Sequence, residues 1–233
     1  MEDIFEGLES VPGVAAYESS SEVANSLLSI CIVTEGAVEE VEYFQYIKEQ
    51  LVEHPDVKIV LNIVNETIGD AEKNVSNPKK RYEQMKNWLA INAPTDGLTD
   101  VQDEEWLVCD RDNSSFSEAQ YDFLLDKVRT DGLHLVVSNP AFQIWLLFHF
   151  ESNIDALNLD SIEKSSDRIR VIEPRLKTHV PDYVHGSLKM ASFSGHIKNA
   201  VANSSNYPTD LLDLKVKSGT NFRDIINRTM PWL

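Results

Sequence analysis

The sequence predicts an α/β fold with a mostly parallel sheet, helices on both faces and a helical C-terminal region. Short apolar runs alternate with amphipathic segments through the first two-thirds of the chain. These runs are almost continuously apolar, as in strands that are buried on both faces. Beyond about residue 154 the chain is polar, with helical patterning and frequent turn signals. Strands that alternate with helices are typical of a parallel sheet covered on both sides.

Each element follows from its own pattern of apolar residues. Segment 39–51 carries Val41, Phe44, Ile47 and Leu51 at the spacing of one helical face. Strands are expected at 27–33, 57–64, 105–109 and 133–137, and helices at 39–51, 77–91, 117–130 and, as a buried apolar segment, 141–150. The regions expected are an acidic N-terminal arm (1–25), an α/β core (26–152) and a helical region packed on that core (153–233).

Composition indicates an intracellular protein. Of the 233 residues, 42% are hydrophobic, which is enough for a sizeable core. Cys31 and Cys109 lie inside apolar runs, so we expect buried thiols in a reducing compartment rather than a disulfide. The longest apolar stretch, 141–150, is too short to span a bilayer, and the first residues lack the basic start of a signal peptide. We therefore expect a cytoplasmic protein with no membrane partner.

The formal net charge of −17 is unusual for a protein that binds nucleic acid. Such proteins normally present a basic surface to the phosphates. Either the basic residues cluster locally, or a partner supplies the positive surface, or the substrate is not a large polyanion. The clearest basic run is 79–81, Lys-Lys-Arg, which fits a solvated helix face better than a phosphate contact.

Acids follow two of the predicted strands. Strand 105–109 leads into Asp110-Arg111-Asp112, and strand 27–33 leads into Glu35-Gly36. Neighbouring carboxylates disfavour each other's ionisation, and a divalent cation such as Mg²⁺ relieves that cost. The alternative readings are an Asx-type turn at the first site and a favourable helix N-terminus at the second. Because parallel strands present their carboxyl ends at one edge of a sheet, we expect the three acids to converge there.

A third motif spans 137–150, with the sequence Val-Ser-Asn-Pro-Ala-Phe-Gln-Ile-Trp-Leu-Leu-Phe-His-Phe. Pro140 keeps Asn139 extended, and Ser138 or Asn139 could cap the helix that follows. The aromatic residues are expected in the core. His149 lies among them at helical spacing, which favours a core histidine over a catalytic one.

These motifs together resemble the Toprim domain of topoisomerases, primases and OLD-type nucleases. More narrowly they resemble the RloB family, a Toprim-like group associated with bacterial restriction and phage-defence loci. Residues 34–44 are similar to its Glu-Gly-(x)3-Glu-(x)2-Tyr-Phe start, 110–112 to its Asp-Arg-Asp motif, and 137–150 to its Ser-Asn-Pro-x-Phe-Glu-x-Trp-Leu-Leu-x-His-Phe motif. The resemblance covers residues 27 to about 151 and implies a Toprim/Rossmann-like core.

The chain departs from the family pattern at two places. Gln143 stands where the third motif usually has an acid, and Tyr183-Val184-His185 stands where the family often has Tyr-x-Lys. A glutamine can orient water or phosphate by hydrogen bonding, but it cannot serve as an anionic ligand or base.

The resemblance implies a divalent-metal-dependent nuclease of a bacterial anti-phage (abortive infection) system, acting on DNA or RNA and conditional on a partner or trigger. It implies Glu35, Asp110 and Asp112 as catalytic residues and as ligands of Mg²⁺ or Mn²⁺, with Glu40 as a further ligand. Supporting or substrate-contacting roles are expected for Glu39, Arg111, Ser138, Asn139, Gln143 and His149. Expected partners are the nucleic acid, an ATPase or sensor protein, and a second copy of the chain.

Two other functions compete with the nuclease. A non-catalytic Toprim-like subunit of a defence complex is favoured by Gln143 and the net charge, and opposed by the intact acids. A phosphotransferase of the haloacid-dehalogenase type also uses Asp-x-Asp after a strand. It normally has that strand near the chain start and a Thr or Val where this chain has Ser114.

Overall fold

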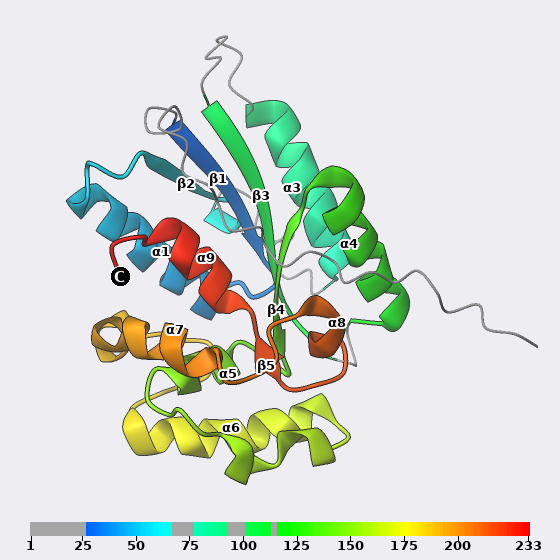
Figure 1. Ribbon diagram of the computed structural model, residues 1–233, viewed down its shortest axis with the longest axis vertical. Helices are drawn as coiled ribbons and strands as arrows, with labels where there is room; N and C mark the ends of the chain where they lie inside the picture. Colours follow the sequence, from blue (N-terminus) through cyan, green and yellow to red (C-terminus); the bar gives the residue numbers. More distant parts are fainter. Residues whose placement is uncertain (1–26, 67–76, 93–100, 113–115) are drawn as a thin grey trace, which may run out of the picture.

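The computed structural model describes residues 27–66, 77–92, 101–112 and 116–233, and it is an α/β structure built on one five-stranded sheet (Figure 1). The strands are β1 (Leu27–Thr34), β2 (Ile59–Ile63), β3 (Val101–Asp110), β4 (His134–Asn139) and β5 (Gly219–Thr220). Their order is β2-β1-β3-β4-β5; the first four are parallel and β5 pairs antiparallel with β4. The predicted α/β fold with a mostly parallel sheet is confirmed.

Helices cover both faces of the sheet. They are α1 (Glu39–Glu53), α3 (Pro78–Asn92), α4 (Glu118–Asp131), α5 (Gln143–Phe148), α6 (Ser165–His179), α7 (Ile197–Ser204), α8 (Leu211–Leu214) and α9 (Phe222–Thr229). Short 3₁₀ turns occur at Val64–Glu66, Asp155–Leu157, Leu159–Ser161, Met190–Ser192 and Ser194–His196. None of the described helices is long and apolar enough to cross a membrane.

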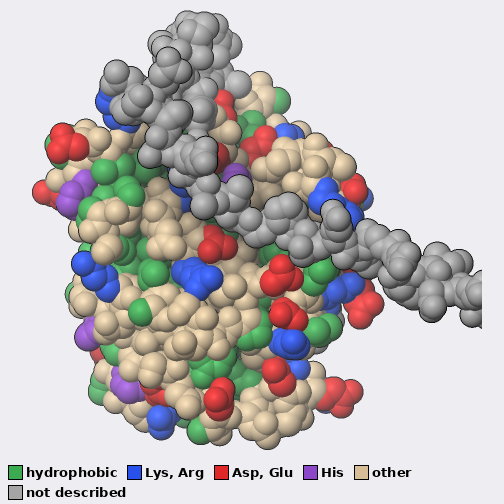
Figure 2. Space-filling model, in the orientation of Figure 1, with side chains coloured by type: hydrophobic (Ala, Val, Ile, Leu, Met, Phe, Trp, Pro, Cys, Tyr) green, Lys and Arg blue, Asp and Glu red, His purple; other side chains and the backbone are tan. Residues whose placement is uncertain are grey.

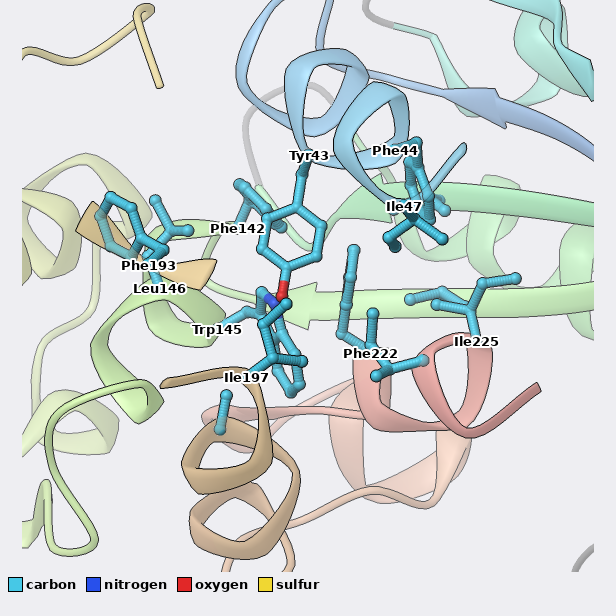
Figure 3. Close-up of a cluster of buried hydrophobic side chains, with 14 of the residues drawn as sticks. Tyr43, Phe44, Ile47, Phe142, Trp145, Leu146, Phe193, Ile197, Phe222 and Ile225 are labelled. Atoms are coloured by element: carbon cyan, nitrogen blue, oxygen red, sulfur yellow. The ribbon is translucent and has the colours of Figure 1, made fainter. Parts of the chain in front are cut away.

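Alternate residues of the strands enter two separate cores. Ile30 and Ile32 of β1 join the cluster under α1, α5, α7 and α9, whereas Cys31 and Val33 join the cluster under α3 and α4. Side chains from α1, α5 and α9 meet in the first cluster (Figure 3). Burial on both faces explains why the sequence of β1 is almost continuously apolar. Both cysteines are buried free thiols, as predicted.

The C-terminal region contributes a strand to the sheet in addition to its helices. Besides α6 to α9 it supplies β5, which pairs with the end of β4 through Ser138–Thr220 and Asn139–Gly219. Phe222, at the start of α9, is fully buried in the first core. The sequence predicted no strand here, because two residues are too few to show an alternating pattern. The predicted N-terminal arm lies outside the described residues.

The third motif is buried as predicted, but its helix is shorter. Every residue of α5 is at most 2% exposed, and the helix ends at Phe148. The expectation that Ser138 or Asn139 caps it is wrong. The helix starts after Phe142 with no side-chain cap, and both residues belong to the end of β4.

Candidate functional site: buried acids at the carboxyl edge of the sheet

The ends of β1 and β3 are joined through Glu35. Its backbone N–H donates to the carbonyl of Val108 (2.8 Å), and its carboxylate Oε2 accepts a hydrogen bond from the N–H of Asp110 (3.1 Å). The Asp110 carboxylate accepts in turn from the N–H of Phe142 (2.8 Å), just ahead of α5. Two of the predicted acids therefore lie together at one edge of the sheet.

Glu40 lies against the glycine that follows Glu35. A Cβ atom added at Gly36 would lie 2.0 Å from Oε2 of Glu40, so a side chain at this position would collide with the carboxylate. Glu40 is 6% exposed, and its carboxylate accepts hydrogen bonds from the backbone N–H groups of Gly36 and Glu40. Glycine in the turn after β1 thus makes room for a third acid.

The pKa values of these acids are raised, chiefly by burial and then by one another. Burial, with the charges of Glu40 and Asp112, raises the pKa of Glu35 to about 8. Burial and the charge of Glu39 raise the pKa of Glu40 to about 7. Burial, Glu40 and Glu35 raise the pKa of Asp110 well above its usual range. Each ionised acid disfavours ionisation of the next, so a cation among them would be stabilising.

Metal binding by these acids remains a prediction. Among the described residues, no group of three or more His, Cys, Asp or Glu is arranged to hold a metal ion. Instead the carboxylates of Glu35, Asp110 and Glu40 accept hydrogen bonds from backbone N–H groups. Their chemistry nevertheless fits Mg²⁺ or Mn²⁺, which prefer hard oxygen ligands. Asp112 is partly exposed and lies close enough for its charge to affect Glu35.

Arg81 enters the acidic site from α3, which the sequence did not predict. Its side chain is fully buried, and Nη2 donates to the carbonyl of Glu35 (3.0 Å). Its charge lowers the pKa of both Glu35 and Glu40, partly offsetting their mutual repulsion. The interpretation of the basic run as a solvated face is therefore wrong for Arg81. Lys79 and Lys80 are exposed as expected.

Glu39 connects α1 to the C-terminal region. One carboxylate oxygen accepts from the hydroxyl of Tyr183 (2.8 Å) and the N–H of Gly186 (3.1 Å), and the other accepts from Nε2 of Gln143 (2.7 Å). Glu39 is 5% exposed, and both of its carboxylate oxygens accept hydrogen bonds from the protein. This geometry indicates that Glu39 links α1 to the C-terminal region, rather than acting as a metal ligand. The sequence analysis placed Tyr183 at the family's Tyr-x-Lys position but did not predict its contact with Glu39.

The two departures from the family pattern touch each other. Nε2 of Gln143 lies 3.2 Å from Nδ1 of His185, which also lies 3.1 Å from Oε1 of Glu173. The other amide atom of Gln143, Oε1, is buried and has no hydrogen-bond partner among the described residues. The position where the family usually has an acid and the position where it often has a lysine are therefore occupied by an amide and an imidazole in contact.

Arg111 turns away from the acids. It donates from Nε to the carbonyl of Lys215 (3.2 Å) and from Nη1 to the carbonyl of Phe116, and its guanidinium lies 5.3 Å from the ring centre of Tyr121. This side chain anchors the turn after β3 to the C-terminal region.

Ser138, Asn139 and His149 are also held by structural bonds. Ser138 Oγ bonds Thr220 Oγ1 (2.9 Å), and Asn139 bonds the carbonyl of Leu214 (2.9 Å) and the guanidinium of Arg168 (3.1 Å). His149 is fully buried, with Nδ1 donating to the carbonyl of Trp145 and Nε2 accepting from the hydroxyl of Tyr43. Burial lowers its pKa to about 3, so it is neutral, as a core histidine should be.

The fold and the site together define an α/β protein with buried acids where its parallel strands end. A comparison with family models matches residues 30–228 to the RloB-like protein family. The chain belongs to this family, as its motifs predicted. No curated protein and no solved structure gives a significant match.

Proposed function

We propose that this RloB-like protein is a divalent-metal-dependent phosphodiesterase that cleaves DNA or RNA in a bacterial anti-phage system. One observation carries the proposal: Glu35, Glu40 and Asp110 lie together at the carboxyl edge of the sheet with their pKa values raised by burial and by one another. Ionising such a cluster costs stability, because the acids are buried and repel one another. A cation bound among the acids would offset that cost.

Glu35, Glu40 and Asp110 would hold Mg²⁺ or Mn²⁺, with Asp112 beside them. A bound ion of this kind supplies an activated water and stabilises charge on the phosphate. If Glu35 is not a ligand of the ion, its pKa of about 8 suits it instead to carry or accept a proton near neutral pH, as a general acid or base must. Arg81 holds the backbone of Glu35 in place.

A non-catalytic binding subunit is the second candidate. It is favoured by the neutral amide of Gln143 at the usual acid position, and by the backbone hydrogen bonds that already engage Glu35, Asp110 and Glu40. In that case the acids would retain only a structural role, and any partner would bind without cleavage of nucleic acid.

The test compares cleavage of single-stranded DNA, duplex DNA and tRNA-like RNA in Mn²⁺, alone and with any protein that co-purifies. Asp110→Ala and Glu35→Gln should each reduce cleavage by about 100-fold or more, since even supporting residues of metal sites contribute about 10–100-fold. Glu49→Gln, the same change at an exposed position of α1, should retain full activity. Equal activity in all variants would indicate a contaminant. No cleavage and no Mn²⁺ binding under any condition would favour the non-catalytic subunit.

A further inference from the structure

A cavity of about 350 Å³ lies near β5 and is distinct from the acidic site. Its lining residues come from the 3₁₀ turns after α5, from the chain between α7 and α8, and from Ser218 just ahead of β5. The volume lies in the range of small-ligand sites. None of the acids, amides or histidines of the candidate site lines this cavity.

Ser218 supplies a polar group without a partner. The residue is 7% exposed, and its Oγ makes no hydrogen bond to any described residue. Its backbone N–H donates to Oδ1 of Asp160 (2.7 Å), so the serine is fixed in place while its hydroxyl remains unsatisfied. An unsatisfied buried hydroxyl costs free energy that a ligand can recover. Because Ser218 lines the cavity, a polar ligand group there would satisfy it.

The other lining groups are acceptors and an aromatic ring. The carboxylates of Asp155 and Asp160 and the amide of Asn158 border the cavity, and none of its described lining residues is Lys or Arg. The Tyr207 ring is held by its hydroxyl, which accepts from the N–H of Ile154 (2.6 Å) and bonds Asp155. Carboxylates beside an aromatic ring favour a cation and disfavour a phosphate.

Lys217, whose charge interacts with that of Asp160, does not fill this role. Its ammonium pairs with Asp213 at 2.8 Å. Lys217 does not line the cavity. The formal net charge of −17 adds a long-range attraction for positive ligands.

We propose that this cavity binds a guanidinium group, carried either by a small cation or by an arginine side chain. A guanidinium is planar and presents five N–H donors, so it can donate to Asp160 and Ser218 together and stack on Tyr207. An ammonium lacks the plane, and a neutral nucleobase lacks the charge. This inference is independent of the nuclease proposal, because it concerns different residues and a binding reaction.

The test is calorimetric titration of the full chain with agmatine, and with a blocked Gly-Arg-Gly peptide and its citrulline counterpart, which keeps the shape of arginine without its charge. We expect the arginine peptide or agmatine to bind at least about tenfold more tightly than the citrulline peptide, and binding to weaken as salt is raised. Similar affinities for agmatine and the peptide would indicate a small-molecule site. A peptide that binds about tenfold more tightly would indicate a protein side chain.

Matched variants locate the binding. Asp160→Asn keeps an acceptor for the Ser218 N–H but removes the charge, and Ser218→Ala removes a hydroxyl that bonds no described residue. Each should weaken guanidinium binding by about tenfold with little change in Tm. Asp126→Asn, the same charge change at an exposed position of α4, should leave binding unchanged.

The proposal would be overturned by equal binding of the arginine and citrulline peptides, by tighter binding of guanosine or cytidine than of agmatine, or by no binding of any probe at millimolar concentration. Unchanged affinity in both Asp160→Asn and Ser218→Ala would also overturn it, because the guanidinium would then bind elsewhere.

Discussion

At the scale of single residues, Glu35 brings together most of the chemistry of the site. Its backbone bonds the end of β3, its carboxylate bonds Asp110, and its carbonyl accepts from Arg81. Glu35 therefore both fixes the backbone between β1 and β3 and places its carboxylate beside the other acids of the site. Structural and chemical roles of Glu35 can be separated, because Glu35→Gln keeps the shape and the hydrogen bond of the side chain while removing its charge.

The first prediction concerns stability and pH in Glu35→Gln. The pKa of Glu35 is about 8 in the folded protein and about 4.3 in an unfolded chain. Its contribution to stability is therefore fully present below about pH 4.3 and is lost as pH rises through about 8. In EDTA, Tm should fall between about pH 4.3 and 8, and Glu35→Gln should reduce that fall by several °C, since 1 kcal/mol corresponds to roughly 2–4 °C at this size.

Two comparisons check this interpretation. Glu49→Gln should leave the pH profile of Tm unchanged, because that side chain is exposed. Adding Mn²⁺ at about pH 8 should raise Tm of the natural sequence and have less effect on Glu35→Gln. If the profiles of Glu35→Gln and the natural sequence coincide, Glu35 ionises freely in the folded protein.

The second prediction concerns Gly36→Ala. The new Cβ would displace the Glu40 carboxylate, whose Oε2 would otherwise be 2.0 Å away. Since a side-chain end can move, we expect a modest loss of stability, about 1 kcal/mol. We expect a larger loss of Mn²⁺ affinity, about tenfold or more, measured by calorimetry. Gly195→Ala, where an added Cβ meets nothing within 4 Å, is the control. Unchanged Mn²⁺ affinity in Gly36→Ala would exclude Glu40 as a ligand.

At the scale of elements, the sequence predicted those helices and strands whose own apolar residues show a regular pattern. Strands β1 and β4 and the second half of β3 are mostly buried and appear in the sequence as apolar runs. Glu35 directly follows β1, and Asp110 is the last residue of β3. The contacts that the sequence could not predict are tertiary. In the sequence, Arg81 has the pattern of an ordinary charged residue on a polar helix. Tyr183 is 144 residues from Glu39, whose carboxylate accepts a hydrogen bond from its hydroxyl. Strand β5 is only two residues long.

The third prediction tests the link between α1 and the C-terminal region. Tyr183→Phe removes the hydroxyl that donates to Glu39, and should cost about 1–2 kcal/mol in the free energy of unfolding. Glu39→Ala should cost more, because Tyr183, Gly186 and Gln143 would each lose an acceptor. Chemical denaturation measures both changes. Tyr46→Phe is the control. Tyr46 lies on α1, as Glu39 does, and its hydroxyl bonds no described residue, so loss of the hydroxyl should change stability little.

Hydrogen exchange distinguishes a local link from a general loss of stability. In Tyr183→Phe the amides of residues 183–188 should exchange faster, while those of β1 and β3 should change only by the global difference in stability. Uniform acceleration across the chain would show that Glu39 and Tyr183 support the whole core rather than this connection.

At the scale of the whole molecule, the negative charge of the protein opposes binding of the proposed nucleic-acid substrate. Figure 2 shows one face of the molecule. On the part of this face formed by described residues, acidic and basic side chains are interspersed, and no continuous basic area is visible. The formal net charge is −17. A polyanion approaching the acidic site therefore meets repulsion from the protein as a whole.

The last prediction follows from this repulsion. At about 10 mM salt the Debye length is roughly 30 Å, comparable to the size of the molecule, and at about 150 mM it is roughly 8 Å. Cleavage of an oligonucleotide by the isolated chain should therefore have a kcat/KM that rises between these concentrations. A nuclease with a basic binding face shows the opposite trend, since salt competes with its phosphate contacts. Salt can also weaken Mn²⁺ binding to the acids, and bis(p-nitrophenyl) phosphate, a singly charged diester, measures that effect separately. The ratio of the two kcat/KM values should increase with salt. A steep decrease would mean that a local basic face guides the substrate, and the net charge would then say nothing about how nucleic acid reaches this site.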